Sequence, residues 1–341
     1  MPRISSSLAA GFSAAALAVT LGCGTTLLPT PAAAAATCDR ECLRGFLTIY
    51  LDALVARDPK RLPLATGARF TENGAEIPPG EGLWFGVQKL GGYRYDYLDP
   101  ESGGAATHVN FVENGAPGLM ALRLKVTNGK IVEIETVLNR NSRNAAQMVP
   151  TEDLWNQVAP PASRLTRAQL AAAAESYLRA VATSDGRAAP FDEETCVRLE
   201  NGGVMAMTRN DQPTAPLPPA STQEPWLKVI RSTLGMGCSA QISTGVYSFI
   251  TSYDNARFPV IDVERQIVFG HWNFRRRGDV KSFTYDGAVI PHMASTQFPN
   301  ENLLGQAFKF RDGKIVRVQG VFYNANVYKI GTGWDKPKPK R

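Results

Sequence analysis

Two tyrosines and two glutamates recur at matching places in the two halves of the chain. Tyr50 and Tyr177 each lie in a stretch with helical apolar spacing, and Glu72 and Glu200 each close a short alternating stretch before Asn-Gly. A carboxylate in an apolar pocket has its pKa raised toward neutrality, so it can take and return a proton. A neighbouring phenol can stabilise negative charge on an oxygen without ionising. The two pairs are therefore candidates for acid–base chemistry next to a carbonyl.

The three histidines extend this set of candidates. His271 lies in an alternating stretch and shares one face with Asn273, whereas Trp272 and Phe274 share the other face. If the polar face lines a pocket, His271 is a second acid or base. His108 has a comparable place in the first half, and His292 lies where it could cover a pocket mouth. The residues expected to bind the substrate are Trp272, Asn273, His292 and Trp226.

Each of these residues also has a purely structural interpretation. An aromatic residue on the buried face of a helix packs in a core in most proteins, which applies to both tyrosines. The glutamates could be solvated or could cap the following loop, and the histidines could be hydrogen-bonded members of a sheet. Asp262 and Glu264 share a strand face, but the adjacent Arg257 and Arg265 favour a surface ion pair.

The elements that must position these residues form a repeat. Helical spacing predicts helices over 43–58 and 170–185, each ending at Asp before a break. Near the end of each half, 121–138 and 305–322 both read as strand, tight turn with Gly, and strand. An insertion separates the matching segments in the second half. The sequence predicts an α+β protein of two tandem cone-shaped domains, each with N-terminal helices packed on a curved, mostly antiparallel sheet. Such a cone leaves an apolar pocket.

The order helix with Tyr, strand ending in Glu-Asn-Gly, and closing hairpin with Gly-Lys-Ile resembles the nuclear transport factor 2-like superfamily. That superfamily includes ketosteroid isomerase and the polyketide cyclases. The full order, including 258–270 and Thr332-Gly333-Trp334, also resembles a poorly characterised family of secreted tandem cone-fold proteins from fungi and bacteria. The resemblance covers nearly the whole chain after residue 36 and is weak for function, because this fold hosts many chemistries.

The resemblance implies roles for the candidate residues. In ketosteroid isomerase a tyrosine on the first helix donates to the developing oxyanion, and a carboxylate at the end of the first strand moves the proton. The matching positions here are Tyr50 or Tyr177 and Glu72 or Glu200. The second oxyanion donor of that enzyme would fall close to Ala121 and Gly305, which have no donor side chain. Steroid isomerisation is therefore not expected.

The N-terminus has the layout of a secretory signal. Arg3 precedes an apolar stretch, and the alanine run Ala32–Ala36 offers a cleavage site. The alternative interpretation is that the protein is a lipoprotein anchored at Cys23. The expected organisation is a signal peptide at 1–36, a first domain at 37–145, a linker at 146–164, a second domain with an insertion at 165–334, and a basic tail at 335–341. We expect a periplasmic or extracellular location.

Cleavage after residue 36 leaves four cysteines, an even number that suggests disulfides in an exported protein. Of the three pairings, we favour Cys196 with Cys238 and Cys38 with Cys42. The cysteines and histidines lack the spacing of a metal site, and no cofactor motif is found. Hydrophobic residues make up 44% and charged residues 20%, typical of a globular protein. The net charge of +6 is partly in the tail, and no basic stripe indicates nucleic-acid binding.

No later segment is long and apolar enough to span a bilayer. The leading hypothesis is an exported, cofactor-independent enzyme of lyase, isomerase or dehydratase type acting on a small hydrophobic or aromatic molecule; hydrolysis is a variant. Glu200, Tyr177 and His271 form its expected site, and Tyr50, Glu72 and His108 form an equivalent but poorer set. The alternative is a non-catalytic module that binds a small ligand or a protein. The two copies could pair sheet to sheet as an intramolecular pseudo-dimer.

Overall fold

The structure is a computed structural model that describes residues 38–140, 142–148, 153–208, 221 and 223–335. The expected signal peptide, Cys23 and the tail beyond Asp335 lie outside these residues. In the part of the chain that is described, none of the helices has the length and hydrophobicity needed to cross a membrane.

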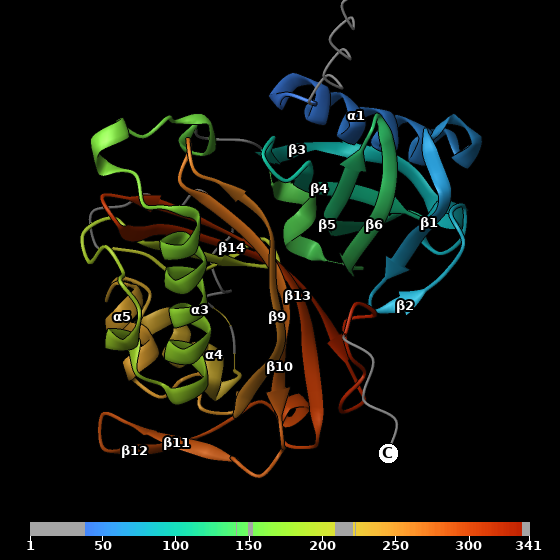
Figure 1. Ribbon diagram of the computed structural model, residues 1–341. Coiled ribbons are helices and arrows are strands. Elements are labelled where there is room, and N and C mark those ends of the chain that lie inside the picture. Colours follow the sequence, from blue (N-terminus) through green and yellow to red (C-terminus); the bar gives the residue numbers. More distant parts are fainter. Residues whose placement is uncertain (1–37, 141, 149–152, 209–220, 222, 336–341) are drawn as a thin grey trace, which may run out of the picture. The chain divides into compact units, whose positions relative to one another are not determined.

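The first half forms a helix and a six-stranded sheet (Figure 1). The strand order is β2-β1-β6-β5-β4-β3, and every neighbouring pair is antiparallel except β1 and β6. Its elements are α1 (Arg40–Ala56), β1 (Leu64–Glu72), β2 (Ala75–Glu76), α2 (Leu83–Gly86), β3 (Val87–Asp99), β4 (Gly104–Glu113), β5 (Ala116–Thr127) and β6 (Lys130–Asn139).

The second half repeats this arrangement. Its strand order is β8-β7-β14-β13-β10-β9, again with a single parallel pair, β7 and β14. Its elements are α3 (Arg167–Thr183), β7 (Val197–Glu200), β8 (Gly203–Ala206), α4 (Pro225–Ser232), α5 (Cys238–Ser243), β9 (Ser252–Asp262), β10 (Ile267–Arg276), β11 (Ser282–Tyr285), β12 (Ala288–Pro291), β13 (Asn300–Arg311) and β14 (Lys314–Ala325). The predicted class, α+β with two tandem units, is confirmed. We call these units the first cone and the second cone.

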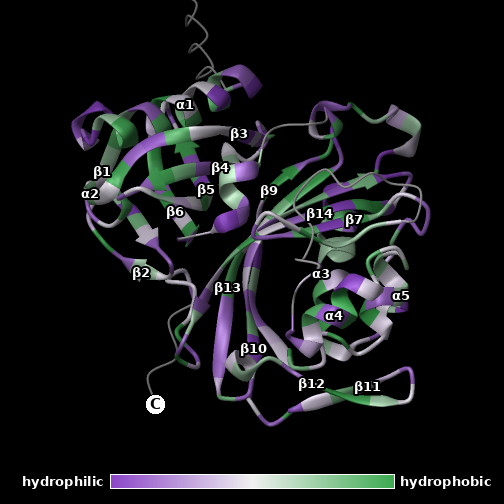
Figure 2. Cartoon of the chain, turned by 180° about the vertical axis from the view of Figure 1, so that it is seen from behind, coloured by the Kyte–Doolittle hydropathy of each residue, from purple (hydrophilic) through white to green (hydrophobic). Residues whose placement is uncertain are grey.

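Short 3-10 helices join the main elements: η1 (Pro59–Arg61), η2 (Arg143–Gln147), η3 (Leu154–Asn156), η4 (Pro161–Ser163), η5 (Gly186–Ala188) and η6 (Ala294–Thr296). The two long helices begin at the capping residues that their sequences offer. Asp39 accepts a hydrogen bond from the backbone N–H of Cys42, and Thr166 forms a capping box with Gln169. Each helix buries one side against its sheet, and Figure 2 shows the mixed hydropathy that results.

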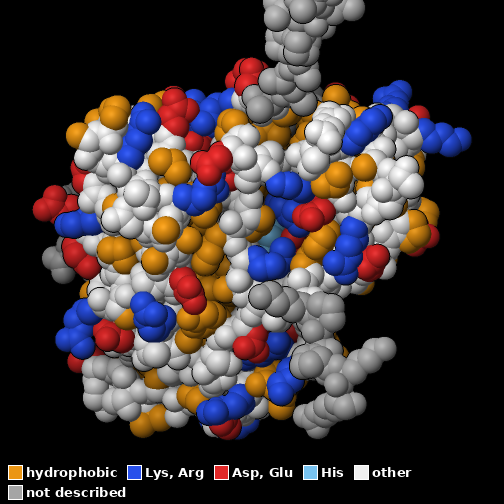
Figure 3. Space-filling view, in the orientation of Figure 1, with side chains coloured by type: hydrophobic (Ala, Val, Ile, Leu, Met, Phe, Trp, Pro, Cys, Tyr) orange, Lys and Arg blue, Asp and Glu red, His pale blue; other side chains and the backbone are white. Residues whose placement is uncertain are grey.

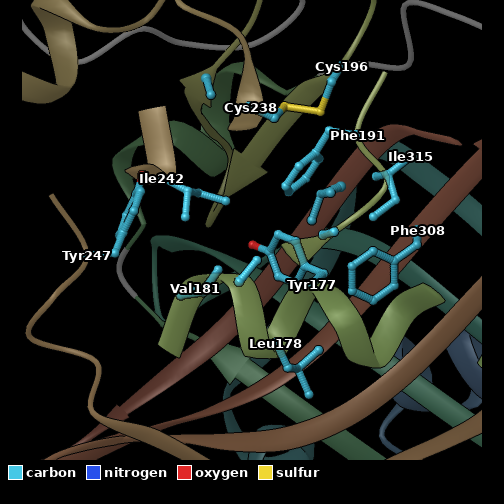
Figure 4. Packing of buried hydrophobic residues seen from close by; sticks show 14 of the residues in the cluster. Tyr177, Leu178, Val181, Phe191, Cys196, Cys238, Ile242, Tyr247, Phe308 and Ile315 are labelled. Carbon is cyan, nitrogen blue, oxygen red and sulfur yellow. A yellow bond between two sulfur atoms is a disulfide. The ribbon is translucent and has the colours of Figure 1, made fainter. Parts of the chain in front are cut away.

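The insertion of the second half adds α4, α5 and the two-stranded hairpin β11–β12. Both disulfides match the favoured pairing: Cys38 pairs with Cys42, and Cys196 pairs with Cys238. The second bond fixes α5 to the segment that enters β7 (Figure 4). This bond therefore anchors the inserted helices to the core of the second cone.

Residues from both sheets meet in a third hydrophobic cluster, in addition to the core of each cone. Tyr97 of β3 stacks on Phe269 of β10, with ring centroids 5.7 Å apart. Arg257 of β9 donates to Glu135 of β6 at 2.6 Å. The outer faces of the two sheets are thus in contact, and their polar residues are buried there. On the side of the molecule seen in Figure 3, charged side chains of both signs are interspersed, without a patch of a single sign.

Candidate functional site

The second cone contains a cavity of about 340 Å³ between its helices and its sheet. Its walls come from α3, α4, β7, β8, β10, β13 and β14 together with the chain around 247–250. Most of the lining is apolar and includes Val181, Met205, Trp226, Phe249, Phe274 and Leu304. The polar side chains are few, and the ones used below are Tyr177, Glu200, Gln306, Asn302, Asn324 and Arg276.

Strand alternation explains why these polar groups converge. On β13, Asn302, Leu304 and Gln306 face the cavity because successive side chains point to opposite sides of a sheet. The register places Gln306 opposite Gly320, which in turn lies opposite Glu200. Four positions further along β13, Asn302 lies opposite Asn324, and two positions beyond it Asn300 lies opposite Arg276. The cavity therefore has one polar end at Glu200 and another at Arg276.

Glu200 is held by an arginine that the sequence analysis missed. Arg198 is 1% exposed, and its Nη2 lies 2.5 Å from Oε1 of Glu200. Its guanidinium also lies 4.7 Å from the ring centroid of Tyr247 and 5.7 Å from that of Tyr177. Burial alone would lower the pKa of Arg198, but the two phenols and Glu200 raise it above its usual value. The ion pair thus holds the carboxyl group of Glu200 at the cavity wall.

Tyr177 presents a neutral phenol to the same cavity. It is 1% exposed, and burial raises its pKa, with Arg198 acting in the opposite direction. Nε2 of Gln306 donates to its hydroxyl at 3.5 Å. Figure 4 shows Tyr177 rising from α3 between Phe191 and Phe308, with Tyr247 on the other side of the cluster. The second cone therefore brings Tyr177 and Glu200 to one cavity, together with Trp226.

The expectation for the polar face of β10 is wrong. His271 and Asn273 lie on the face of β10 that meets the first cone, because Phe274 and Arg276 occupy the cavity side. Nδ1 of His271 donates to the carbonyl of Leu304 at 3.0 Å, and its Nε2 lies 3.5 Å from Oε2 of Glu135. Asn273 donates to Glu301 at 3.1 Å. His271 is therefore not brought to Glu200.

Two other expected substrate contacts are also placed elsewhere. Trp272 is on the inner face of β10 but is packed in the core, stacked on Phe308 at 5.9 Å. His292 accepts or donates a hydrogen bond with Ser248 at 2.9 Å and stacks on Phe283 of the inserted hairpin. Burial lowers the pKa of His292 to about 4. Neither residue is among those that line the cavity.

The matching residues of the first cone have structural roles. Tyr50 is buried with its ring 5.6 Å from that of Trp84, edge to face. Glu72 accepts a hydrogen bond from the backbone N–H of Leu83 and another from Arg140, both at 2.9 Å. The structural alternative, a carboxylate that holds the following loop, therefore describes Glu72.

His108 lies in the contact between the cones rather than beside Glu72. Its Nε2 donates to the carbonyl of Gly305 at 3.0 Å, and its Nδ1 accepts from the hydroxyl of Tyr97 at 3.0 Å. Burial lowers the pKa of His108 to about 3. Its neutral imidazole therefore has both nitrogens occupied.

The residues that sequence reasoning missed carry a recognisable signal. Arg198 precedes Glu200 by two positions and so shares its strand face, and Arg276 has the same relation to Phe274. Both arginines could have been found once the cavity face was known. In the described ranges, no group of three or more His, Cys, Asp or Glu side chains is arranged to hold a metal ion.

The chain contains two tandem α+β cones, of which the second encloses a mainly apolar cavity lined by a carboxylate, two phenols and the buried Arg276, with Arg198 paired to the carboxylate. The chain belongs to the family described as Domain of unknown function (DUF8021), which matches residues 36–138 and 163–322. These two segments contain all but the last residues of the two sheets. A comparison with curated proteins finds no match.

Solved structures with a similar fold include a candidate isomerase from Bacillus subtilis, at 11% identity over 46% of this chain and 87% of that chain, with a TM-score of 0.27. A candidate polyketide cyclase from Streptomyces antibioticus, IdmH, has 14% identity over 45% and 91%, with a TM-score of 0.25. An NTF-2 like protein of unknown function from Burkholderia xenovorans has 18% identity over 35% and 88%, with a TM-score of 0.21. At these identities the likeness concerns the fold alone.

Proposed function

We propose that the second cone is the active site of a cofactor-independent enzyme of lyase or isomerase type, acting on a small, mainly hydrophobic or aromatic carbonyl compound. The observation that carries the proposal is the presence of a carboxylate and a neutral phenol on the walls of one apolar cavity, Glu200 and Tyr177. The cavity volume of about 340 Å³ is in the range of small-molecule sites.

In this proposal Glu200 takes the proton next to the substrate carbonyl and returns it at another carbon or to a leaving group. The hydroxyl of Tyr177 donates a hydrogen bond to the oxygen on which negative charge develops. Gln306 reaches that hydroxyl with its Nε2 and so orients it. Arg198 holds the carboxylate in place and supplies positive charge beside it.

A second candidate, a non-catalytic binding module, is supported by the same ion pair. The tight contact of Glu200 with Arg198 gives the carboxylate a structural partner that a general base does not need. In that case the cavity holds a ligand without changing it.

The two candidates can be separated with a simple carbonyl probe. We would measure deuterium incorporation at the α-carbon of 2-tetralone in D₂O by NMR, with the wild type and with Glu200→Gln, Glu200→Asp and Tyr177→Phe. For the enzyme, Glu200→Gln lowers the exchange rate at least ~100-fold, the usual size of a general acid–base contribution. Glu200→Asp retains part of the rate because it keeps the carboxylate.

The first cone supplies matched controls. Glu72→Gln and Tyr50→Phe remove the same groups from the other copy, and they leave the exchange rate unchanged if the second cone is the active one. Equal losses in both cones, or a Glu200→Gln protein that remains folded and fully active, would overturn the assignment. Native mass spectrometry of protein purified from its own host would identify a retained ligand, and wild-type protein without exchange activity that retains a ligand supports the binding module.

We also propose that the protein works in an oxidising compartment, in the periplasm or outside the cell, after removal of a signal peptide at 1–36. The two disulfides support this location, because such bonds are rare in the reducing cytosol. The contact between the outer faces of the sheets supports an intramolecular pseudo-dimer of domains 37–145 and 165–334. In it, the first cone serves as the packing partner of the second.

A further inference from the structure

Arg276 is a buried cation at the end of the cavity opposite to Glu200. It is 6% exposed, and its guanidinium lies 5.3 Å from the ring centroid of Phe249. Its Nη1 donates to the side-chain oxygens of Asn300 at 3.1 Å and Asn324 at 3.5 Å. Its Nε has no hydrogen-bond partner. A buried donor on a charged group is costly when it is left without a partner.

The carboxylates around Arg276 are already paired with other arginines. On the neighbouring positions of the chain, Arg275 pairs with Glu301 and Arg277 pairs with Asp279. Glu200, at the far end of the cavity, pairs with Arg198. In the described part of the chain, Arg276 itself forms no ion pair with a carboxylate. Burial lowers its pKa to about 10, with Glu200 acting to raise it, so it remains charged at neutral pH.

The cavity wall also carries hydrogen-bond acceptors that have no donor. The side-chain oxygens of Asn302 and Gln306 are buried and have no hydrogen-bond donor. Both residues line the cavity on β13, four positions apart on the same face. Because these oxygens are acceptors, a ligand in the cavity would satisfy them with a hydroxyl or N–H group.

The positions of these groups indicate which chemical group of a ligand would bind at each part of the cavity. We propose that the cavity of the second cone takes an amphipathic organic acid, whose carboxylate binds Arg276 and whose body carries a hydroxyl group that donates to Asn302 or Gln306. The body lies against the apolar wall that includes Trp226 and Phe274. The inference rests on the proposed function only in using the same cavity, and it names the class of substrate.

The test compares matched small molecules on the wild-type protein by isothermal titration calorimetry. The probes are 3-(4-hydroxyphenyl)propanoate, its methyl ester, and 3-phenylpropanoate, which lacks the hydroxyl. A charge-assisted hydrogen bond in a buried site is worth about 1.5–3 kcal/mol, so we expect the acid to bind roughly 10- to 100-fold more tightly than the ester. A neutral hydrogen bond predicts a loss of about three- to tenfold when the hydroxyl is absent.

Two variants locate the contact. Arg276→Gln removes the preference for the acid over the ester, and Arg276→Lys retains part of it because the charge remains. Arg277→Gln is the matched control, since Arg277 is the next residue, carries the same charge and is 60% exposed in its side chain. It leaves the preference unchanged. The wild-type comparison of acid and ester remains valid even if Arg276→Gln does not fold.

Three results overturn the inference: no binding of the acid, equal binding of acid and ester, or a preference that survives in folded Arg276→Gln. Its failure is distinct from failure of the proposed enzyme. A preference for the acid without exchange of 2-tetralone upholds the ligand class and rejects the chemistry. Exchange that depends on Glu200, without any preference for the acid over the ester, upholds the chemistry and rejects the ligand class.

Discussion

The two cones share a strand order and a Tyr–Glu pair in register, but they differ in what fills the space between helix and sheet. In the first cone, the short helix α2 follows β2 closely and inserts Trp84, which is 2% exposed, against Tyr50. In the second cone, the chain after β8 runs through the inserted helices α4 and α5 before it returns to the sheet. Trp226 of α4 lines the cavity there and does not fill it.

This difference shows that residues in register do not have the same role. Glu72 holds α2 by accepting from the N–H of Leu83, so its carboxylate is used inside the fold. Glu200 lies opposite Gly320 on the cavity wall, where its partner is the side chain of Arg198. The insertion, rather than the repeat, creates a place where chemistry is possible.

The first test of the comparison removes the Trp84 side chain, which fills the space between helix and sheet in the first cone. Trp84→Ala should destabilise the protein by about 3–5 kcal/mol, because it deletes a large buried side chain and leaves a cavity. Trp226→Ala should cost less, since one side of Trp226 already borders open space. Urea denaturation of both variants measures the difference. Added indole should restore part of the stability of Trp84→Ala, and equal costs in the two cones would contradict this account.

The disulfides offer a second comparison between the cones. Their cysteines are separated by 42 residues for Cys196–Cys238 and by 4 for Cys38–Cys42. Loop-closure entropy then predicts losses of about 4 and about 2 kcal/mol when each pair is replaced by Ser. Thermal unfolding under oxidising conditions provides the measurement. A larger loss for the short loop would show that the second bond does not anchor the inserted helices as described.

The contact between the cones should make the protein sensitive to acid. Burial lowers the folded-state pKa of His271 to about 4 and that of His108 to about 3, below the ordinary value of 6.5. As the pH falls from about 6.5 toward 4, the unfolded chain takes up protons that the folded chain does not, so stability is lost. Burial would raise the pKa of Glu135, but His271 and two arginines lower it to about 2, which adds a further loss below about pH 4.5.

We expect the free energy of unfolding to fall by about 2–3 kcal/mol for each of the two histidines between pH 7 and pH 4.5. The measurement is urea denaturation over this range, and His271→Gln should flatten the dependence. His292→Gln is a control outside the contact between the cones; because burial also lowers the pKa of His292, its own effect must be subtracted. Stability that rises as the pH falls would have the wrong sign.

The smallest expected effect concerns the carboxylate of the first cone. Glu72→Gln weakens the hydrogen bond to Leu83 and the ion pair with Arg140, and it should cost about 1 kcal/mol, as for the loss of a helix cap. Circular dichroism during thermal unfolding can detect it. Binding of ligands to the second cone should not change; a change would mean that the two cones are coupled more strongly than their contact suggests.

Local pattern was sufficient for much of the fold. The apolar spacing of 43–58 and 170–185 predicted helices that the structure places at Arg40–Ala56 and Arg167–Thr183. The paired Gly-Lys-Ile turns predicted the hairpins β5–β6 and β13–β14, because a tight turn between alternating stretches specifies an antiparallel pair. The cysteine count and spacing likewise favoured the two disulfides that the structure contains.

The site could not be derived from the alternation of polar and apolar residues along the strands. The sequence of β10 separates His271 and Asn273 from Trp272 and Phe274, but it does not say which face looks inward. That choice was made by the first sheet, whose Glu135, paired with Arg123, lies beside His271 on the polar face of β10. His108 lies in the same contact rather than beside Glu72. Tyr177 and Glu200 could be paired from the repeat alone, whereas their surroundings, with Arg198 paired to Glu200 and Arg276 elsewhere on the cavity wall, were decided by tertiary packing.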